Sequence, residues 1–177
     1  MGVAASAVIA WIGLQRGSLR LVACAAAPLL IGALAAAIGW GVITPGEHAQ
    51  QRVEQLVAAV VAGDVAAAKE CFSERASIHV GRLNSPGEGR DRIDRAFDSF
   101  AGRHRIESNT LLSLDARTLS DEAGEVEIAC RTTTVSSAGA VPTRWHFEVV
   151  REQDGIWRIL RITWLRLGGE VPSLSLL

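Results

Sequence analysis

The hydrophobic pattern of this sequence changes from helical spacing to strict alternation near Arg105, and the alternation continues to Leu167. A period of two is typical of strands that are buried on one face. In the second and third predicted strands, apolar side chains alternate with charged ones, so we expect a sheet with one apolar and one charged face. The predicted strands, which are separated by glycine-containing turns, cover residues 105–119, 124–136, 142–152 and 156–167.

Helical spacing dominates the region before this sheet. Residues 47–62 carry valines and a leucine on one side, Gly63 is placed to end that helix in the left-handed conformation, and Asp64 is placed to cap a second helix over 65–72. A third amphipathic segment covers 89–102, and its charged side is expected to be a solvated face with local ion pairs. The short run "ASIHVG", residues 76–81, is predicted to be a further strand. This order predicts an α+β domain with three helices on the apolar face of a curved antiparallel sheet.

The N-terminal region has a different composition. Residues 21–43 form a stretch of 23 residues without a charge, which is long enough for a transmembrane helix. Residues 2–14 are also uncharged but short, so we consider both a helical hairpin and a single signal-anchor helix. Either arrangement places Arg16 and Arg20 on the cytoplasmic side and exports the remainder. We therefore predict a protein of the cytoplasmic membrane, with an anchor over 1–46, an extracytoplasmic domain over 47–168 and a tail over 169–177.

Charge and cysteine content restrict the partners and cofactors. The formal net charge of the chain is −1, and no basic patch indicates nucleic-acid binding. Cys71 and Cys130 are 59 residues apart and lack metal-ligand spacing, so we expect no metal and no cofactor. A disulfide between them is one alternative in an oxidising compartment, and two buried free thiols are the other.

Three segments together carry a family resemblance. The stretch "VEQLVAAVVAGDVAAAKECFSERASIHV", the helix "GRDRIDRAFDSF" and the closing hairpin "TRWHFEVVREQDGIWRILRITW" follow one another in this order. Residues 47–167 therefore resemble the SnoaL-like domains of the nuclear transport factor 2-like superfamily. The resemblance implies a cone, in which a bent sheet wraps around helices and often leaves a cavity at its wide end. It also implies that a homodimer through the sheet is a candidate assembly, as in many relatives.

His79 is the sharpest candidate for catalysis, because an imidazole titrates near neutral pH and strand alternation could direct it into the mouth of the cone. Isomerases of the superfamily place an aspartate near the end of this strand and use a tyrosine. The corresponding positions here are His79, Val80 and Gly81, and the sequence contains no tyrosine. The alternative is that His79 is an ordinary strand residue. Of the other histidines, His146 is predicted to lie on the charged sheet face.

The remaining histidines and the aromatic residues complete the candidate set. His104 is expected to be exposed, and His48 has no evident partner. Trp145, Trp157 and Trp164 could form an aromatic wall or simply fill the core. The residues that we predict to line a pocket are His79, Phe97, Trp145, Phe147 and Trp164.

Two functional hypotheses follow. The first is a membrane-anchored, non-enzymatic domain that binds a small apolar ligand or assembles with itself or with another envelope protein. The second is a SnoaL-like enzyme of the isomerase, hydrolase or dehydratase type, which acts on a small apolar substrate with His79 as acid and base. An enclosed pocket that contains His79 and a second polar group would favour the enzyme.

Overall fold

The computed structural model describes residues 43–103, 106–135 and 139–172. Its helices are α3 (Pro45–Ala62), α4 (Val65–Glu70) and α5 (Arg90–Arg103). The first helix begins two residues earlier than predicted, because Thr44 is the N-cap of α3 and Pro45 is its first residue. The Thr44 side chain accepts a hydrogen bond from the Glu47 backbone, and the Glu47 carboxylate accepts one from the Thr44 backbone. Proline at this position removes no helical hydrogen bond.

The junction between α3 and α4 agrees with the sequence prediction. Gly63 has a φ of 73° and its backbone N–H bonds to the end of α3. The Asp64 carboxylate accepts a hydrogen bond from the Ala67 backbone at 3.0 Å. The second helix ends earlier than predicted, at Glu70, because Phe72 already belongs to the first strand.

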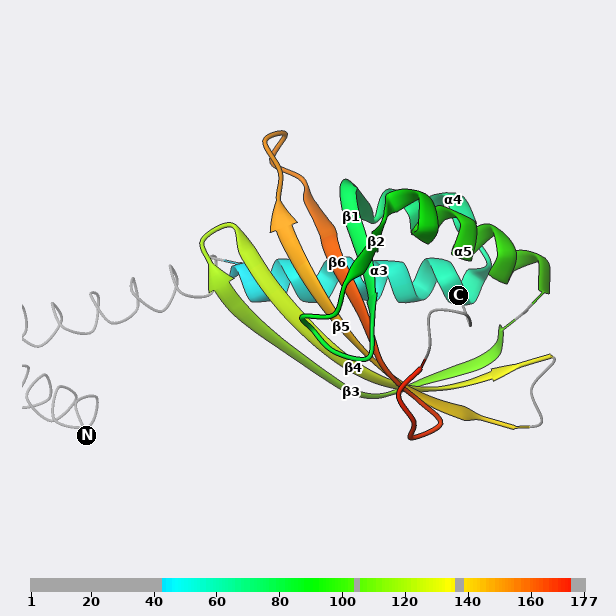
Figure 1. The fold of residues 1–177 in the computed structure, drawn as a ribbon. Helices are drawn as coiled ribbons and strands as arrows, with labels where there is room; N and C mark the ends of the chain where they lie inside the picture. Colours follow the sequence, from blue (N-terminus) through cyan, green and yellow to red (C-terminus); the bar gives the residue numbers. More distant parts are fainter. Residues whose placement is uncertain (1–42, 104–105, 136–138, 173–177) are drawn as a thin grey trace, which may run out of the picture. The chain divides into compact units, whose positions relative to one another are not determined.

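The described residues form one six-stranded sheet in the order β2-β1-β6-β5-β4-β3, and Figure 1 shows that it is strongly curved. The strands are β1 (Phe72–Val80), β2 (Gly87–Gly89), β3 (Ile106–Ser120), β4 (Ala123–Thr134), β5 (Val141–Arg151) and β6 (Trp157–Leu167). The four long strands that the sequence predicted are present with shifts of one or two residues. The short strand β2 was not predicted.

The predicted antiparallel sheet requires a correction, because the sheet is mixed. β1 pairs with β6 in parallel, with Ile78 opposite Ile162 and Val80 opposite Trp164, whereas the other neighbouring strands are antiparallel. Alternation of side chains is the same in both kinds of pairing. A local pattern therefore could not give the direction in which two strands so distant in sequence meet.

The helices cover the apolar face of this sheet. α3 lies along that face, and α5 lies beside β1 (Figure 1). Val53 and Leu56 of α3 pack in one hydrophobic core with Val126, Ile128 and Phe147 of the sheet, and all five are buried. The helices thus hold the sheet in its curved form and leave the other face uncovered by any described helix.

The opposite face of the sheet is charged, as the sequence predicted. One row of paired positions runs across four strands through Arg117, Glu125, Glu148 and Arg161. The Arg161 guanidinium lies 3.2 Å from the Glu148 carboxylate, and Arg117 lies 3.9 Å from Glu125. We call this surface the outer face and the helix-covered surface the inner face.

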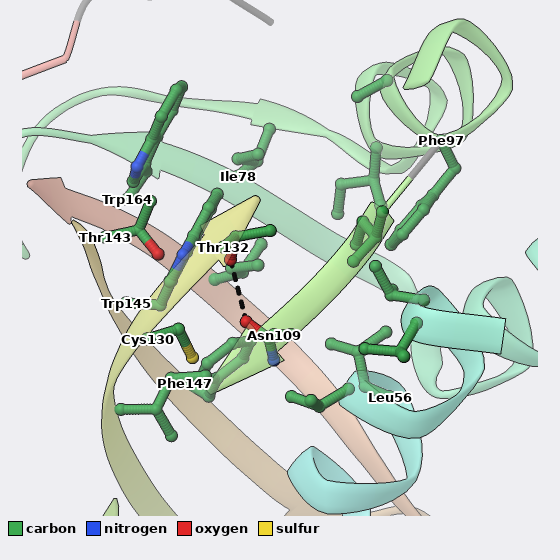
Figure 2. A pocket seen from close by; sticks show the side chains of 18 of the residues that line it. Leu56, Ile78, Phe97, Asn109, Cys130, Thr132, Thr143, Trp145, Phe147 and Trp164 are labelled. Carbon is green, nitrogen blue, oxygen red and sulfur yellow. Dashed lines mark hydrogen bonds between the residues drawn. The ribbon is translucent and has the colours of Figure 1, made fainter. Parts of the chain in front are cut away.

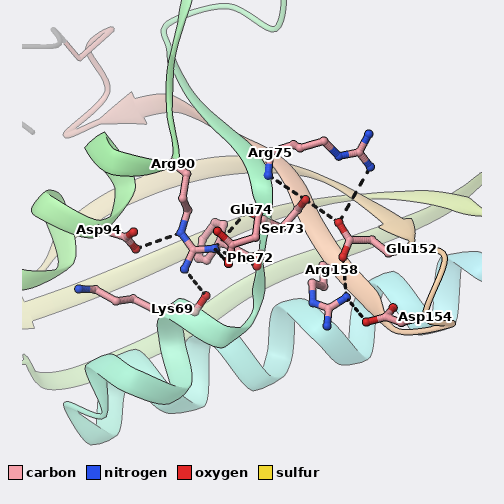
Figure 3. A network of polar contacts seen from close by, with 10 residues as sticks. All are labelled: Lys69, Phe72, Ser73, Glu74, Arg75, Arg90, Asp94, Glu152, Asp154 and Arg158. Atoms are coloured by element: carbon pink, nitrogen blue, oxygen red, sulfur yellow. Dashed lines mark hydrogen bonds and ion pairs between the residues drawn. The ribbon is translucent and has the colours of Figure 1, made fainter.

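The charged side of α5, which was predicted to be a solvated face, is only partly exposed to solvent, because Arg90 is largely buried. Its guanidinium donates hydrogen bonds to the backbone carbonyls of Lys69, Phe72 and Ser73 at 3.0–3.1 Å, and its Nε bonds to Asp94 at 3.0 Å (Figure 3). This arginine therefore connects the start of α5 to the junction between α4 and β1.

The ends of the chain and the cysteines complete the description. The predicted membrane segments 2–14 and 21–43 lie outside the described residues, apart from Ile43, and so do tail residues 173–177. None of the described helices combines the length and the apolar character needed to cross a bilayer.

Cys71 and Cys130 are buried free thiols, so the predicted alternative of a disulfide is not realised.

Candidate functional site

A cavity of about 510 Å³ lies between the inner face of the sheet and helices α3 and α5. Figure 2 shows Trp145, Phe147 and Trp164 projecting from the sheet, with Leu56 of α3 and Phe97 of α5 on the helical side. The side chains of the sheet and of the two helices do not fill the space between them. The cone is therefore hollow.

The wall of this cavity is neutral. Among the described residues that line it, none is an aspartate, glutamate, lysine, arginine or histidine. The apolar members include Val57 and Val60 of α3, Ile93 of α5, and Ile128 and Ile162 of the sheet. An ionised ligand would find no opposite charge in this wall, and burial of an unpaired charge is costly.

Aromatic side chains shape one part of the wall. The rings of Trp145 and Trp164 stack in parallel, with centroids 5.1 Å apart and planes inclined by 4°. The indole N–H of Trp164 donates to the Arg166 carbonyl at 3.0 Å, which fixes the orientation of that ring. Phe97 contacts Phe72 edge to face at 5.7 Å. The structure thus places four of the five predicted lining residues, Phe97, Trp145, Phe147 and Trp164, in the wall.

The fifth predicted lining residue, His79, does not line the cavity. Its neighbour Ile78 does, and successive side chains of a strand point to opposite faces, so His79 lies on the outer face. Its Nδ1 lies 2.7 Å from the Ser85 carbonyl, which can only accept, so Nδ1 carries the proton. Its Nε2 then accepts a hydrogen bond from the Ser77 hydroxyl at 2.9 Å. Both ring nitrogens are therefore engaged in holding the loop that follows β1.

The other histidines lie elsewhere. His146 is on the outer face, as predicted, and its Nε2 lies 3.3 Å from the Glu125 carboxylate. His48 was expected to have no partner, but its ring stacks on Trp157 at 5.0 Å. Trp157 therefore packs against α3 and does not belong to the cavity wall. His104 lies outside the described residues.

Sequence reasoning missed a polar strip in the cavity wall, formed by Asn109, Cys130, Thr132 and Thr143. The Thr132 hydroxyl donates to the Asn109 side-chain oxygen at 2.8 Å (Figure 2). Cys130 and Thr143 are opposite each other in the β4–β5 pairing. In sequence, the signal was the inner-face alternation of β4, which continues from Ile128 into residues with polar side chains.

Cys130 is the titratable group of this wall. Burial raises the pKa of its thiol, and a hydrogen bond with Asn109 opposes part of that increase. The thiol is therefore protonated near neutral pH, and the described wall offers no adjacent base to activate it.

A second hollow of about 450 Å³ lies between α3 and β3. It shares Val57, Val61, Asn109 and Ile128 with the main cavity, and Leu111 and Leu114 extend it along β3. Asn109 therefore stands at the boundary between the two hollows.

Figure 3 shows the charged cluster that joins β1 to the β5–β6 hairpin, and none of the charged residues drawn there lines the cavity. The buried Ser73 hydroxyl donates to Glu152 at 2.6 Å, and Arg158 pairs with both Glu152 and Asp154. Arg158 therefore forms its ion pairs within its own hairpin. No group of acidic, histidine and cysteine side chains suited to a metal ion occurs in the described part of the chain.

Solved structures with the same fold include an NTF2-like protein of unknown function from Pseudomonas putida KT2440, with 13% identity and a TM-score of 0.55 over 65% of this chain and 81% of that one. A protein with a cystatin-like fold from Caulobacter vibrioides has 18% identity and a TM-score of 0.56 over 73% and 92%. A ketosteroid isomerase-like protein from Erwinia carotovora atroseptica has 13% identity and a TM-score of 0.50 over 67% and 94%. At these identities the likeness concerns the fold alone.

No curated protein matches the chain. The model of the SnoaL-like domain family matches residues 47–163, which is more than half of the sequence. The match includes most of α3, all of α4 and α5, all of β1 to β5, and most of β6. It therefore spans the helices and strands that enclose the cavity, and the chain belongs to the SnoaL-like domain family.

Proposed function

We propose that this domain binds one small, uncharged and largely apolar molecule in its cavity and does not transform it. The observation that carries the proposal is a hollow of about 510 Å³ whose described wall contains aromatic and aliphatic side chains but no ionised group. Apolar contact supplies roughly 25 cal/mol for each Å² removed from water, whereas an unpaired buried charge is costly. Such a wall therefore favours neutral over charged ligands.

The same wall gives little support to catalysis. Proton transfer to a bound molecule needs a titratable group within hydrogen-bond reach. The described wall supplies the Cys130 thiol, whose pKa is raised by burial, and no carboxylate or imidazole. His79, the acid and base of the enzyme hypothesis, lies on the other face of the sheet with both ring nitrogens engaged.

Binding of the fluorescent apolar probe N-phenyl-1-naphthylamine tests the proposal. The purified full chain is compared with Ala96→Trp, which introduces an indole at a lining position of α5. The matched control is Ala66→Trp, where the alanine is exposed on α4 and outside the cavity wall. All three are measured in the same detergent, so that partition of the probe into micelles cancels. Saturable binding by the wild type and by Ala66→Trp, but not by Ala96→Trp, supports the proposal, and equal signals from all three contradict it.

We further propose that residues 21–43 anchor this domain to the outer side of the cytoplasmic membrane. The support is the uncharged stretch of 23 residues and the position of Arg16 and Arg20 before it. Protease treatment of intact spheroplasts tests this topology. We expect the protease to digest the domain on intact spheroplasts. Protection of the domain until the membrane is lysed would contradict the proposed topology.

Self-association through the outer face is a second candidate role, and one observation favours it. The ion pair between Arg144 and Glu127 on this face, at 3.3 Å, is exposed, so charges of both signs are accessible there. A second copy could pack against this surface through complementary charges. Sedimentation of the full chain tests this role. Glu127→Arg replaces the acidic partner of Arg144 with a second positive charge on the outer face. The control is Asp121→Arg, in the turn between β3 and β4. Self-association requires a dimer that Glu127→Arg weakens and that Asp121→Arg leaves unchanged.

A further inference from the structure

Asn109 occupies a special position in the wall of the cavity. It projects from the inner side of β3, where the main cavity meets the hollow between α3 and β3. Its side-chain oxygen accepts the Thr132 hydroxyl hydrogen at 2.8 Å, as Figure 2 shows. Because the oxygen is occupied in this way, the amide nitrogen is the end of the group that remains for other contacts.

The amide nitrogen carries two hydrogens and therefore two donor positions. Among the described residues, the Asn109 side chain also acts on the neighbouring Cys130 thiol, whose pKa it lowers. Sulfur is a weak acceptor, and the surrounding wall consists mainly of hydrocarbon. At least one amide hydrogen is thus available to a molecule in the cavity.

The charge of the wall limits which acceptor can use this donor. A carboxylate or phosphate would need a cation to offset its desolvation, and the described wall contains none. A neutral carbonyl oxygen accepts an amide hydrogen without that requirement. Thr143, across from Cys130 on β5, extends the polar strip without adding charge.

We propose that Asn109 is a specificity-determining residue, which donates a hydrogen bond to a neutral carbonyl group on an otherwise apolar ligand. This proposal rests on the proposed function, because it assigns the ligand class of the same cavity. The ligand lies with its hydrocarbon part against Phe97, Phe147 and Ile93, and with its carbonyl oxygen at the Asn109 amide. Thr132 is a positioning residue, because its hydroxyl holds the amide oxygen and so turns the nitrogen toward the cavity.

Two ligands of matched size, 2-acetylnaphthalene and 2-ethylnaphthalene, test the proposal by displacement of N-phenyl-1-naphthylamine. They differ in a carbonyl group, and 2-naphthoate serves as the charged analogue. The full chain is compared with Asn109→Leu, and the ratio of the two affinities is taken within each protein, so that differences in water solubility cancel. One neutral hydrogen bond predicts that this ratio falls about three- to tenfold in the variant, while 2-ethylnaphthalene binds both proteins equally.

The outcomes separate the two proposals. If neither naphthalene displaces the probe from the wild type, the proposed function fails. If both bind but the ratio is the same in the wild type and the variant, or if 2-naphthoate binds best, the role of Asn109 fails. Asn109→Val, whose branched side chain suits a strand, is measured in parallel and is expected to give the same change. Binding of 2-ethylnaphthalene reports in each variant that the cavity is intact.

Discussion

Ile78 and His79 are neighbours in β1 but face opposite sides of the sheet: Ile78 lines the cavity, and the His79 ring bonds to Ser77 and Ser85 on the outer face. Their separation has a functional consequence. The side chain in this strand with the most useful acid–base chemistry is directed away from the hollow that could hold a substrate. It connects β1 to the loop before β2, and its role in this position is structural.

We predict that His79→Ala leaves ligand binding unchanged and lowers stability modestly. The substitution removes two hydrogen bonds, each worth about 1 kcal/mol, so the free energy of unfolding should fall by roughly 1–2 kcal/mol. Urea denaturation measures that change, and N-phenyl-1-naphthylamine binding measures the cavity. A loss of probe affinity in a variant that remains folded would show that the imidazole reaches the ligand.

Gly87 gives a sharper test of the His79 position. It pairs with His79 across β1 and β2, and a Cβ at Gly87 would lie 2.4 Å from the His79 ring. Gly87→Ala should therefore displace the ring and destabilise the wild type, by about 1–3 kcal/mol for an overpacked site. In the His79→Ala background the same substitution should cost much less.

Gly89→Ala is the matched control for that experiment. Gly89 belongs to the same strand, and a Cβ there would meet nothing within 4 Å. Urea denaturation of the four combinations of His79 and Gly87 variants gives the interaction energy. Equal effects of Gly87→Ala in both backgrounds would mean that the ring does not lie over Gly87.

The sequence was sufficient for the strands and for much of the cavity wall, because these depend on local alternation. In β4, Val126, Ile128 and Cys130 are buried and Glu127 is not, as the pattern requires. The same rule applied to β1 groups Ala76 with Ile78 on the inner face and so places His79 on the outer one. Alternation by itself only separates His79 from Ile78, and the expectation that His79 faces the cavity assigned these two residues to the wrong faces of the sheet.

Asn109 could not be found in the same way, because β3 does not keep one phase. The pairing with β4 shifts between Leu111 and Ser113, where a bulge adds one residue. Leu114 and Asn109 therefore both reach the hollows beside α3, although a regular strand would place them on opposite faces. The parallel pairing of β1 with β6 was hidden for another reason, since it depends on long-range contacts and not on any local pattern.

Arg90 is predicted to be the arginine of α5 on which stability depends most. Its guanidinium satisfies three backbone carbonyls at the junction of α4 and β1, and an alanine would leave these partly buried acceptors unpaired. Each such loss costs about 1–3 kcal/mol, and they are not additive, so we expect Arg90→Ala to destabilise by roughly 3–5 kcal/mol.

Arg95→Ala on the same helix is the control, because Arg95 is exposed, and its effect should stay within about 0.5 kcal/mol. Arg90→Lys should rescue only part of the loss, since a single ammonium group cannot reach all of the acceptors that the planar guanidinium spans. Thermal or urea denaturation ranks the three variants. Similar stabilities of Arg90→Ala and Arg95→Ala would contradict the anchoring role.

The lowered pKa of Asp154, in the β5–β6 hairpin, predicts how stability depends on pH. The pKa of its carboxyl group is lowered, first by the hydrogen bond from the Ile156 backbone and then by Arg158. A carboxyl group whose pKa is lower in the folded state stabilises that state above its unfolded pKa, near 3.8, and the contribution is lost as the pH falls through the folded value. Asp154→Asn should therefore reduce stability at pH 7 but flatten the acid side of the profile. Denaturant midpoints between pH 7 and pH 2 measure both effects, with Asp121→Asn in the β3–β4 turn as the control. If the wild type and Asp154→Asn lose stability in parallel below pH 4, the carboxylate does not hold this turn.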